Sequence, residues 1–378
     1  MSDFNCTLAK SLSPEEKKVL GQNLHRQGVG ENIFLVYENL VDRLSEELQL
    51  LCVKAYAGGE IAGAAFFMRV QPVDMLASIS ALGENAVVRS LLAPFTARNK
   101  ACAYLCMRST STANIMSPFF VRETASADRV AGAILSYLKR DTGAELLMIM
   151  DSPLRNGLYA SAGFCGYPCP SEAVLELTQY RSLADYLAEH RSTKKHIAPK
   201  KNIAVSVQSD GLTPADMVGI SACIRDSARH AKSKLPYGDK FMQQTLESDM
   251  FRSRHYRHVI VRVDGAIAGF HSYLPCGSSL GAIVGGFNRE ASQKNYVYER
   301  LIAATVDYAL QHGLERIHYG IVDNQTKLRL TNTLEPNRAY YYLASPVERR
   351  VMRLLNKHTD VYKLFALEES LKSAGSEH

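Results

Sequence analysis

One short pattern occurs twice in the sequence, and it limits what the chain can fold into more than any other feature. Gly-x-Ile-Ala-Gly occupies positions 59–63 and again 265–269. The first glycine of the pattern is the second residue of a Gly58-Gly59 pair in one copy and of an Asp264-Gly265 pair in the other. Such pairs supply the positive φ values of a two-residue hairpin turn. Each copy therefore predicts a β-hairpin, and we expect the chain to contain two related units.

A helix and then a strand are predicted after each hairpin. Residues 128–139 and 301–310 carry apolar side chains at helical spacing, and a glycine follows each stretch. The segments 146–150 and 316–319 then read as strands. The first copy has a longer stretch between its hairpin and its helix, and we expect the additional residues within 75–122. The predicted fold class of both units is α+β, with a mixed α/β sheet.

The chain of 378 residues is long enough for two domains of ordinary size. We expect an N-terminal domain at 1–178, a basic linker helix at 179–201 and a C-terminal domain at 202–378. Further helices are expected within 14–49 and 346–372. With 46% hydrophobic and 22% charged residues, the composition is ordinary for a globular protein, which excludes a mostly disordered chain and a long coiled coil.

The charge and the cysteines restrict the function only loosely. The net charge of +6 and the pI of about 8.8 permit an anionic ligand such as a nucleotide, CoA or RNA, and identify none of them. The eight cysteines include no Cys-x-x-Cys pair and no histidine cluster stands beside them, so no metal site is expected. No apolar run predicts a membrane span. Because no secretory signal is visible, we expect reduced thiols and a cytoplasmic protein.

Three further motifs stand beside these elements. The run Asn-Gly-Leu-Tyr-Ala-Ser-Ala-Gly-Phe at 156–164 resembles the Leu-Tyr-x-x-x-Gly-Phe run near the end of GNAT domains. The strand 173–177, the Tyr-Leu helix 182–191 and the basic residues after it are similar to the joint in double-GNAT proteins of the FemAB and BioF2-like kind. The segment 319–330 resembles the end of FemAB-like domains, where a glycine and a lysine follow a strand. The resemblance covers roughly residues 30–345.

This resemblance implies two tandem GNAT-like domains of the acyl-CoA N-acyltransferase type. In such domains two central parallel strands splay apart and admit the acyl donor. The implied activity is that of a transferase that moves an acyl or aminoacyl group to a small-molecule amine and forms an amide. The implied donor substrate is acyl-CoA or aminoacyl-tRNA, so tRNA is one of the partners considered, and no permanently bound cofactor is implied. The chemistry needs an orienting cleft, a group that takes the amine proton and a donor for the developing oxyanion.

The sequence departs from CoA-using GNAT proteins at one motif. Those proteins carry Arg/Gln-x-x-Gly-x-Gly/Ala at the start of the central helix, where backbone N–H groups reach the pyrophosphate. The corresponding segments here, 122–129 and 289–295, contain no glycine. The departure weakens the acetyl-CoA interpretation and suits an aminoacyl-tRNA donor. Acyl-CoA bound with altered geometry and a carrier-protein donor stay open.

The C-terminal copy has more polar side chains at the expected cleft, so we predict that it is the catalytic one. Lys327 matches the lysine of FemAB-like domains and would hold a donor phosphate or stabilise the oxyanion. Asp323 would act as the base or as a partner of Lys327, and His271 would take the proton of the amine. Tyr159 in the first copy is expected to pack in the core. The predicted donor-binding residues are Gly285, Gly286, Tyr298, Arg300, Lys194 and Lys195.

A different class of function is also compatible with the sequence. Each residue named above has a plain structural alternative, such as a surface lysine, a turn aspartate or a packed histidine. A non-catalytic protein that keeps the double-GNAT fold and only binds a ligand or RNA is therefore the alternative prediction. The missing glycines favour it, and the grouping of Lys327, Asp323 and His271 opposes it.

Overall fold

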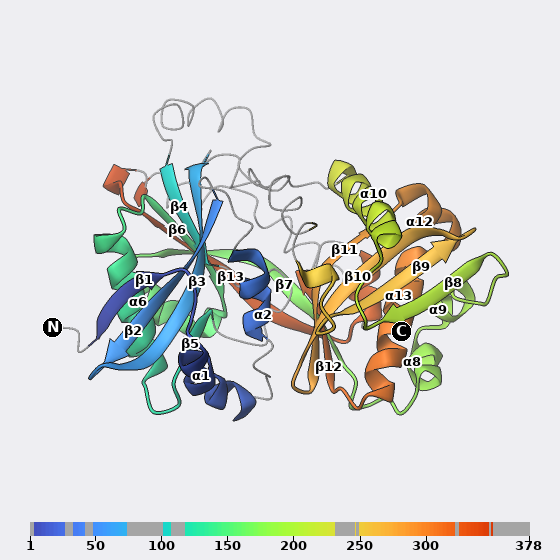
Figure 1. Ribbon diagram of the computed structural model, residues 1–378, viewed down its shortest axis with the longest axis horizontal. Helices are drawn as coiled ribbons and strands as arrows, with labels where there is room; N and C mark the ends of the chain where they lie inside the picture. The colour runs from blue at the N-terminus through green and yellow to red at the C-terminus, as the bar shows by residue number, and fades with distance from the viewer. Residues whose placement is uncertain are drawn as a thin grey trace.

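The structure, a computed structural model, describes residues 4–26, 33–41, 48–73, 101–106, 118–230, 246, 249–321, 325–347 and 349–350. Two halves lie side by side, and one sheet runs through both of them (Figure 1). Among these residues the sheet has 13 strands in the order β1-β2-β3-β4-β6-β13-β7-β12-β11-β10-β9-β8, with β5 paired to β3. Helices pack on the sheet, so the predicted α+β class with a mixed sheet is confirmed.

The first unit follows the predicted order of helices, hairpin, helix and strand. Most of the expected insertion at 75–122 lies outside the described residues, apart from β4 and β5. The elements of this unit are β1 (Asn5–Ala9), α1 (Pro14–Arg26), α2 (Ile33–Val41), β2 (Leu48–Ala57), β3 (Glu60–Val73), β4 (Ala101–Cys106), β5 (Phe119–Val121), α6 (Ala127–Asp141), β6 (Leu146–Asp151), the 3-10 helix η2 (Pro153–Arg155), α7 (Asn156–Ser161) and β7 (Cys165–Glu176).

The linker and the second unit repeat this order with shorter connections. Most of the helical stretch expected at 346–372 lies outside the described residues. The elements are α8 (Leu183–Glu189), α9 (Arg191–His196), β8 (Ile203–Gln208), α10 (Pro214–His230), the 3-10 helix η3 (Asp249–Phe251), β9 (Arg257–Val263), β10 (Ala266–Cys276), β11 (Ser279–Phe287), α12 (Arg289–Asn295), α13 (Val297–Gln311), β12 (Arg316–Ile321), α14 (Gln325–Leu330) and β13 (Thr333–Leu343).

The two predicted hairpins are present and equivalent. β2 pairs with β3 and β9 pairs with β10, in both cases antiparallel. Gly63 faces Ala55 in the first ladder, and Gly269 faces Val261 in the second. Directly after these pairs both ladders shift register, which marks a β-bulge at the same place in each copy. The sequence duplication is therefore a structural duplication, down to the irregularity in the ladder.

The last glycine of each repeat lets the central helix approach the sheet. A Cβ at Gly63 would lie 2.5 Å from Cγ1 of Val130 and 2.7 Å from the carbonyl oxygen of Phe120. A Cβ at Gly269 would lie 2.5 Å from Cγ1 of Val297. The two valines belong to the first turns of α6 and α13. Any side chain at either glycine would push the helix away from its hairpin, because such distances are shorter than real Cβ contacts.

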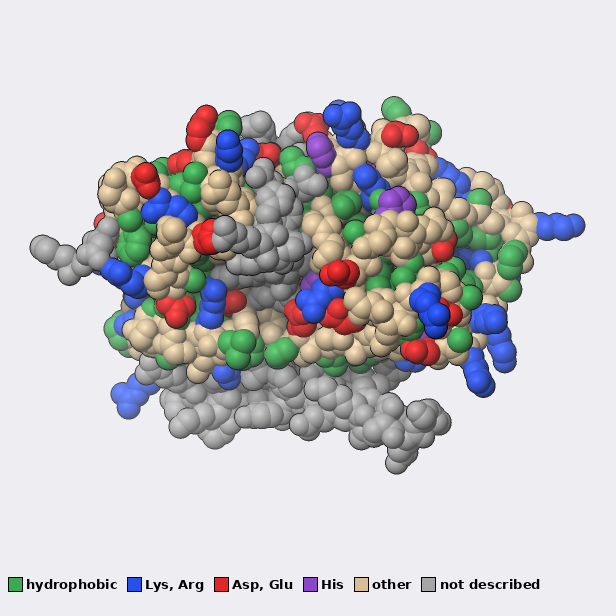
Figure 2. Space-filling view, turned by 90° about the horizontal axis from the view of Figure 1, so that it is seen from below, with side chains coloured by type: hydrophobic (Ala, Val, Ile, Leu, Met, Phe, Trp, Pro, Cys, Tyr) green, Lys and Arg blue, Asp and Glu red, His purple; other side chains and the backbone are tan. Residues whose placement is uncertain are grey.

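The linker forms two short helices instead of the single helix expected. α8 and α9 are separated at His190, which leaves the helical conformation with φ −107° and ψ 58°. The imidazole stacks on the ring of Tyr186 at 4.2 Å, and its Nδ1 lies 2.9 Å from the carbonyl oxygen of the same residue. Lys and Arg side chains gather at the end of the molecule that contains α8, α9 and β8 (Figure 2).

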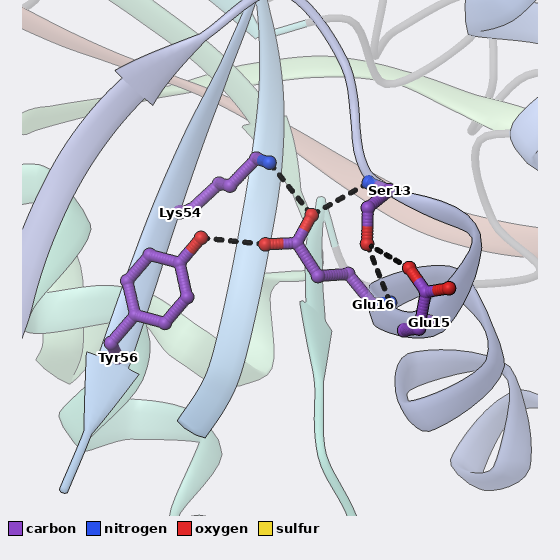
Figure 3. A network of polar contacts seen from close by, with 5 residues as sticks. All are labelled: Ser13, Glu15, Glu16, Lys54 and Tyr56. Atoms are coloured by element: carbon purple, nitrogen blue, oxygen red, sulfur yellow. Dashed lines mark hydrogen bonds and ion pairs between the residues drawn. The ribbon is translucent and has the colours of Figure 1, made fainter. Parts of the chain in front are cut away.

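A capping box fixes α1 to the first hairpin. The Ser13 N–H donates to Oε2 of Glu16 at 2.7 Å, and the Glu16 N–H donates to the Ser13 hydroxyl at 3.3 Å. The same carboxylate accepts from the Tyr56 hydroxyl at 2.6 Å and pairs with Nζ of Lys54 at 2.7 Å (Figure 3). Burial raises the pKa of Glu16, but the hydrogen bonds from Lys54 and Tyr56 outweigh it, so the pKa is lowered overall.

In the second unit, different residues form an equivalent capping box that also binds the hairpin. The Thr213 N–H donates to Oδ2 of Asp216 at 3.1 Å, and the Asp216 N–H donates to the Thr213 hydroxyl at 3.2 Å. Asp216 also forms an ion pair with Arg262 of β9. Arg262 and Tyr56 both follow the bulge of their hairpin, so the capping acid of each helix binds the equivalent strand position.

The two units exchange strands. β13, from the end of the described chain, lies between β6 and β7, and its residues 338–343 pair with all of β6. β7, from the first unit, lies in turn between β13 and β12 of the second. The ladder of hydrogen bonds thus continues from one unit to the other. The domain limits at 178 and 202 stay predictions, because the sheet itself has no break at either.

We predict that Gly63→Ala and Gly269→Ala each lower the free energy of unfolding by about 1–3 kcal/mol, since the new methyl group overpacks a helix–sheet contact. Gly132→Ala in α6 is the control, because its Cβ would meet only Leu158 Cδ1 at 4.0 Å. This variant should be neutral or more stable by up to about 1 kcal/mol from helix propensity. Urea unfolding followed by circular dichroism measures all three. Equal stability of Gly63→Ala and Gly132→Ala would contradict the close approach.

Candidate active site between β11 and β12

Two parallel strands of the second unit separate after a short contact. β11 pairs with β12 only from Ser279 to Gly281, opposite Arg316 to His318. β11 then continues to Phe287 without β12 beside it, and Ile321 of β12 pairs with β7. The first unit has a similar arrangement, since the parallel pairing of β4 with β6 also spans three residues. The splayed strands expected from the sequence are therefore present in the second unit.

A histidine lies over the open part of β11. His271 of β10 stands opposite Gly285 in the antiparallel ladder. A Cβ on Gly285 would lie 2.2 Å from Cδ2 of the imidazole, so only glycine leaves room for the ring in this position. Two residues predicted for the site are therefore in direct contact, and each fixes the conformation available to the other.

A chain of hydrogen bonds leads from His271 into the core. Its Nδ1 lies 2.9 Å from the Tyr273 hydroxyl, and that hydroxyl lies 3.1 Å from Oγ1 of Thr305 in α13. The Thr305 hydroxyl lies 2.7 Å from the carbonyl oxygen of Leu301, which can only accept. The threonine proton therefore points at the backbone, and the chain holds the imidazole through Tyr273. Burial raises the pKa of Tyr273, so its hydroxyl stays protonated.

The electrostatics keep His271 neutral. Burial and, second, the charge of Lys327 lower its pKa from 6.5 to about 3. Lys327 lies in α14 with 9% of its surface exposed, on the segment that follows β12. An imidazole with so low a pKa accepts a proton from an ammonium group poorly, because a general base functions best with a pKa near the operating pH. His271 is thus suited to orient a ligand rather than to deprotonate one.

Aromatic side chains complete this side of the opening. Tyr298, in the first turn of α13, meets the His271 ring edge-on with ring centroids 5.5 Å apart. Tyr319 of β12 meets Tyr273 in the same manner at 6.4 Å. The Tyr319 hydroxyl is buried with no hydrogen-bond partner among the described residues. Sequence reasoning missed Tyr319, although it directly precedes the Gly of the motif at 319–330.

Other predicted donor-binding residues have different surroundings. Gly286 packs under α10, where a Cβ would lie 3.0 Å from the backbone of Cys223. Arg300 is buried, and its guanidinium donates hydrogen bonds of 2.8–3.0 Å to the carbonyl oxygens of residues 196–198. This guanidinium therefore holds the linker against α13. Lys194 and Lys195 are exposed on α9, and Asp323 lies outside the described residues.

The segment that corresponds to the pyrophosphate loop is helical. Residues 289–295 form α12, and the Asn288 side chain caps it by accepting from the Ala291 N–H at 2.8 Å. The Ser292 and Tyr296 N–H groups bond to carbonyls one turn earlier. Backbone N–H groups used inside a helix cannot also cradle a pyrophosphate. The segment without glycine thus forms a helix and not a pyrophosphate-binding loop.

Tyr159 of the first unit, which was expected to pack in the core, lies behind the end of β6. Tyr159 is fully buried, stacks on Tyr340 of the exchanged strand at 3.9 Å and donates to Oδ2 of Asp151 at 2.8 Å. Its predicted role in packing is confirmed. Asp151 is 2% exposed and also accepts from the Ser152 N–H at 2.7 Å, so this end of β6 is closed by its own side chains.

The comparisons with known proteins agree with this fold. No protein-family model matches the sequence, and no curated protein matches it. Among solved structures, FemX is similar with a TM-score of 0.56 at 10% identity, covering 93% of this chain and 100% of that one. A tandem GNAT protein from the clavulanic acid biosynthesis pathway is similar with a TM-score of 0.54 at 14% identity, covering 90% and 99%.

A third similar structure is the C-terminal DUF2156 domain of an Agrobacterium fabrum protein named after lysylphosphatidylglycerol synthetase. Its TM-score is 0.52 at 11% identity, and the match covers 90% of this chain and 95% of that one. The protein therefore has the tandem GNAT fold over nearly its whole length. In the described part of the chain, no helix is long and apolar enough to cross a membrane.

We predict that the His271 imidazole stays neutral throughout a titration from pH 8 to pH 4.5. Lys327→Met should raise the pKa of His271, because it removes the positive charge that disfavours the imidazolium. Arg140→Met, an exposed site on α6 of the other unit, should leave that pKa unchanged. NMR of the histidine ring protons measures it. A His271 pKa at its ordinary value in the wild type would contradict the assigned burial.

The same shift makes stability depend on pH. The unfolded chain binds a proton at His271 near pH 6.5, whereas the folded protein binds it only near pH 3. The contribution of the neutral His271 to the free energy of unfolding is therefore fully present above about pH 6.5, and it is lost as the pH falls toward 3. His271→Gln should lose less unfolding free energy than the wild type between pH 6.5 and 4. Parallel losses in both proteins would show that other groups dominate this range.

Proposed function

We propose that the protein is a transferase that moves an acyl or aminoacyl group to an amine and forms an amide, and that the opening between β11 and β12 is the active site. The observation that carries the proposal is the separation of these strands after Gly281, beside His271 and Lys327. An open strand edge offers backbone N–H and C=O groups to an extended donor arm. Such pairing would hold an acyl carbonyl in a fixed position for attack.

The residues around the opening suit separate parts of this reaction. The ammonium group of Lys327 would stabilise negative charge on the donor or on the tetrahedral intermediate. The neutral His271, held by Tyr273 and Gly285, would orient the donor. The largely buried Tyr298 and Tyr319 would exclude water, which would otherwise hydrolyse the activated acyl group.

Two observations favour aminoacyl-tRNA over acyl-CoA as the donor. α12 occupies the place where a pyrophosphate loop would lie, and Lys194 and Lys195 are exposed on a helix that packs beside α13. Exposed lysines contact a nucleic-acid backbone readily. The similar structure of FemX is compatible with either donor, because the likeness extends to the fold alone.

We predict that Lys327→Met reduces turnover by about 10²–10³, the cost of losing one oxyanion donor. Lys327→Arg should restore activity only in part, because a planar guanidinium does not replace a compact ammonium in a fitted site. The measurement is single-turnover amide formation with acyl-CoA or aminoacyl-tRNA as donor, and Arg140→Met is the control. Wild-type turnover by a folded Lys327→Met protein would place the reaction elsewhere.

The response to salt separates the two donors. With aminoacyl-tRNA, the logarithm of the binding constant should fall steeply with the logarithm of salt concentration, because each neutralised phosphate releases counterions. Replacing Lys194 and Lys195 together by Gln should lower this slope by about 1–2. A flat salt response with strong inhibition by free CoA would instead identify acyl-CoA. Binding of either donor without any turnover would favour the non-catalytic alternative.

A further inference from the structure

A row of charged side chains crosses the strands where the two units join. Glu172 of β7 stands directly opposite Glu335 of β13 and close to His318 of β12, on the strand pairs of the exchange. Glu176 and Arg316 continue the row along the same two strands, β7 and β12. In the view from below, acidic and basic side chains lie side by side near the middle of the molecule (Figure 2).

The inner members of this row are buried and incompletely bonded. Glu172 and His318 are each 1% exposed. Nδ1 of His318 lies 3.7 Å from Oε1 of Glu172, which is too long for a hydrogen bond. Both ring nitrogens of His318 and Oε1 of Glu172 have no hydrogen-bond partner among the described residues. Buried polar groups in folded proteins are nearly always bonded, so a group kept in this state calls for a role beyond packing.

The charges of the row do not balance. Arg316 binds Glu176 through two contacts of 2.6 and 3.0 Å and lies 3.8 Å from Glu335. The row thus holds three carboxylates, Glu172, Glu176 and Glu335, against one guanidinium and one imidazole. Burial raises the pKa of Glu335, and the charge of Glu172 raises it further, against opposite effects of His318 and Arg316. Two close carboxylates in a buried site favour the binding of a cation, because it relieves their repulsion.

The position of the row relates it to the proposed active site. His318 stands opposite Gly281, the last paired residue before β11 and β12 separate. Its neighbours Ile317 and Tyr319 pack in the core that contains α13, so His318 points to the other face of the sheet. His271 hydrogen-bonds toward α13 through Tyr273 and Thr305. The imidazoles of His271 and His318 thus belong to opposite faces of the sheet, near the start of the opening.

We propose that Glu172, His318 and Glu335 form the site for the amine acceptor, and that this acceptor binds as a primary ammonium ion. The proposal rests on the proposed function, because it assigns the second substrate of the same opening. Glu335, with 28% of its side chain exposed, is the entrance and binds the ammonium group. Glu172 is a positioning residue whose carboxylate lies 3.7 Å from Nδ1 of His318 and favours the proton on that nitrogen by its charge, which leaves Nε2 to act as the base toward the amine.

The reaction then balances without a further cofactor. The ammonium ion gives one proton to Nε2 of His318, and the nitrogen lone pair forms the C–N bond to the acyl carbon. The bond from that carbon to the donor's oxygen or sulfur breaks with its electron pair. The leaving group takes the second proton from nitrogen, and His318 returns its proton to solvent. Donor and acceptor thus meet from opposite faces of one sheet.

A stability test distinguishes a ligand site from an ion pair that only stabilises the fold. If Glu172 and His318 only stabilised the fold, Glu172→Gln would remove a buried charge partner and lower the melting temperature by several degrees. If the site instead holds an excess of negative charge for a ligand, Glu172→Gln should leave the melting temperature unchanged or raise it. Glu145→Gln, at an exposed position before β6, is the control for replacing a carboxylate.

Binding of a probe amine tests the site without any acyl donor. Butylammonium chloride is titrated into the full chain at pH 7 and followed by calorimetry, with 1-butanol as the uncharged probe. We expect binding of the ammonium only, weakened at least tenfold in Glu335→Gln and in Glu172→Gln, and unchanged in Glu145→Gln. No binding to the wild type, or equal binding by all variants, would overturn the proposal.

Activity separates this proposal from the proposed function. With a working donor, Glu335→Gln should raise the KM for the amine with little change in kcat. Glu172→Gln and His318→Asn should lower kcat, also at saturating amine. Ammonium binding without turnover with any donor would support this site and count against the transferase. Turnover that all three variants retain would support the transferase and overturn the acceptor site.

Discussion

The exchange of strands between the two units determines the rest of the structure. β13 completes the sheet of the first unit, and β7 joins β13 to β12 of the second. Because ladder hydrogen bonds run through all three strands, neither unit can rotate against the other without breaking them. Glu172, Glu335 and His318 come from these three strands, so their contact exists only in the exchanged arrangement. The opening between β11 and β12 adjoins this exchange, since β12 pairs with β7 at Arg316–His318 and again at Ile321, whereas its pairing with β11 ends at His318.

Within each unit, a second set of contacts fixes the helices. A glycine in the hairpin admits a valine of the central helix, and an acidic capping residue ties the first long helix to the strand after the bulge. The residues differ between the copies, with Glu16 and Tyr56 in one and Asp216 and Arg262 in the other. The geometry is the same, which indicates that these contacts maintain the fold. The polar residues of the opening, such as His271 and Lys327, belong to the second unit alone.

The parts of this structure that depend on local pattern could be predicted from the sequence. The hairpins followed from the repeated glycines, and the central helices from apolar spacing. The exchange could not be predicted, because β7 and β13 each read as an ordinary last strand and their pairing joins distant parts of the chain. Arg300 also shows this limit, since a sequence cannot distinguish a guanidinium that binds backbone carbonyls from one that awaits a phosphate. Glu172 was missed, although a charged residue beside the apolar run 173–175 was a usable signal.

Hydrogen–deuterium exchange of the full chain, with and without donor, tests the central claim most directly. A donor arm that pairs with the open edge of β11 should slow exchange of the amides in 282–287. The donors to compare are an acyl-CoA and an adenosine that carries an aminoacyl group through a stable amide. The account predicts protection in 282–287 and at the start of α13, with none in β4 or β6. Protection confined to the first unit, or absent with every donor, would contradict it.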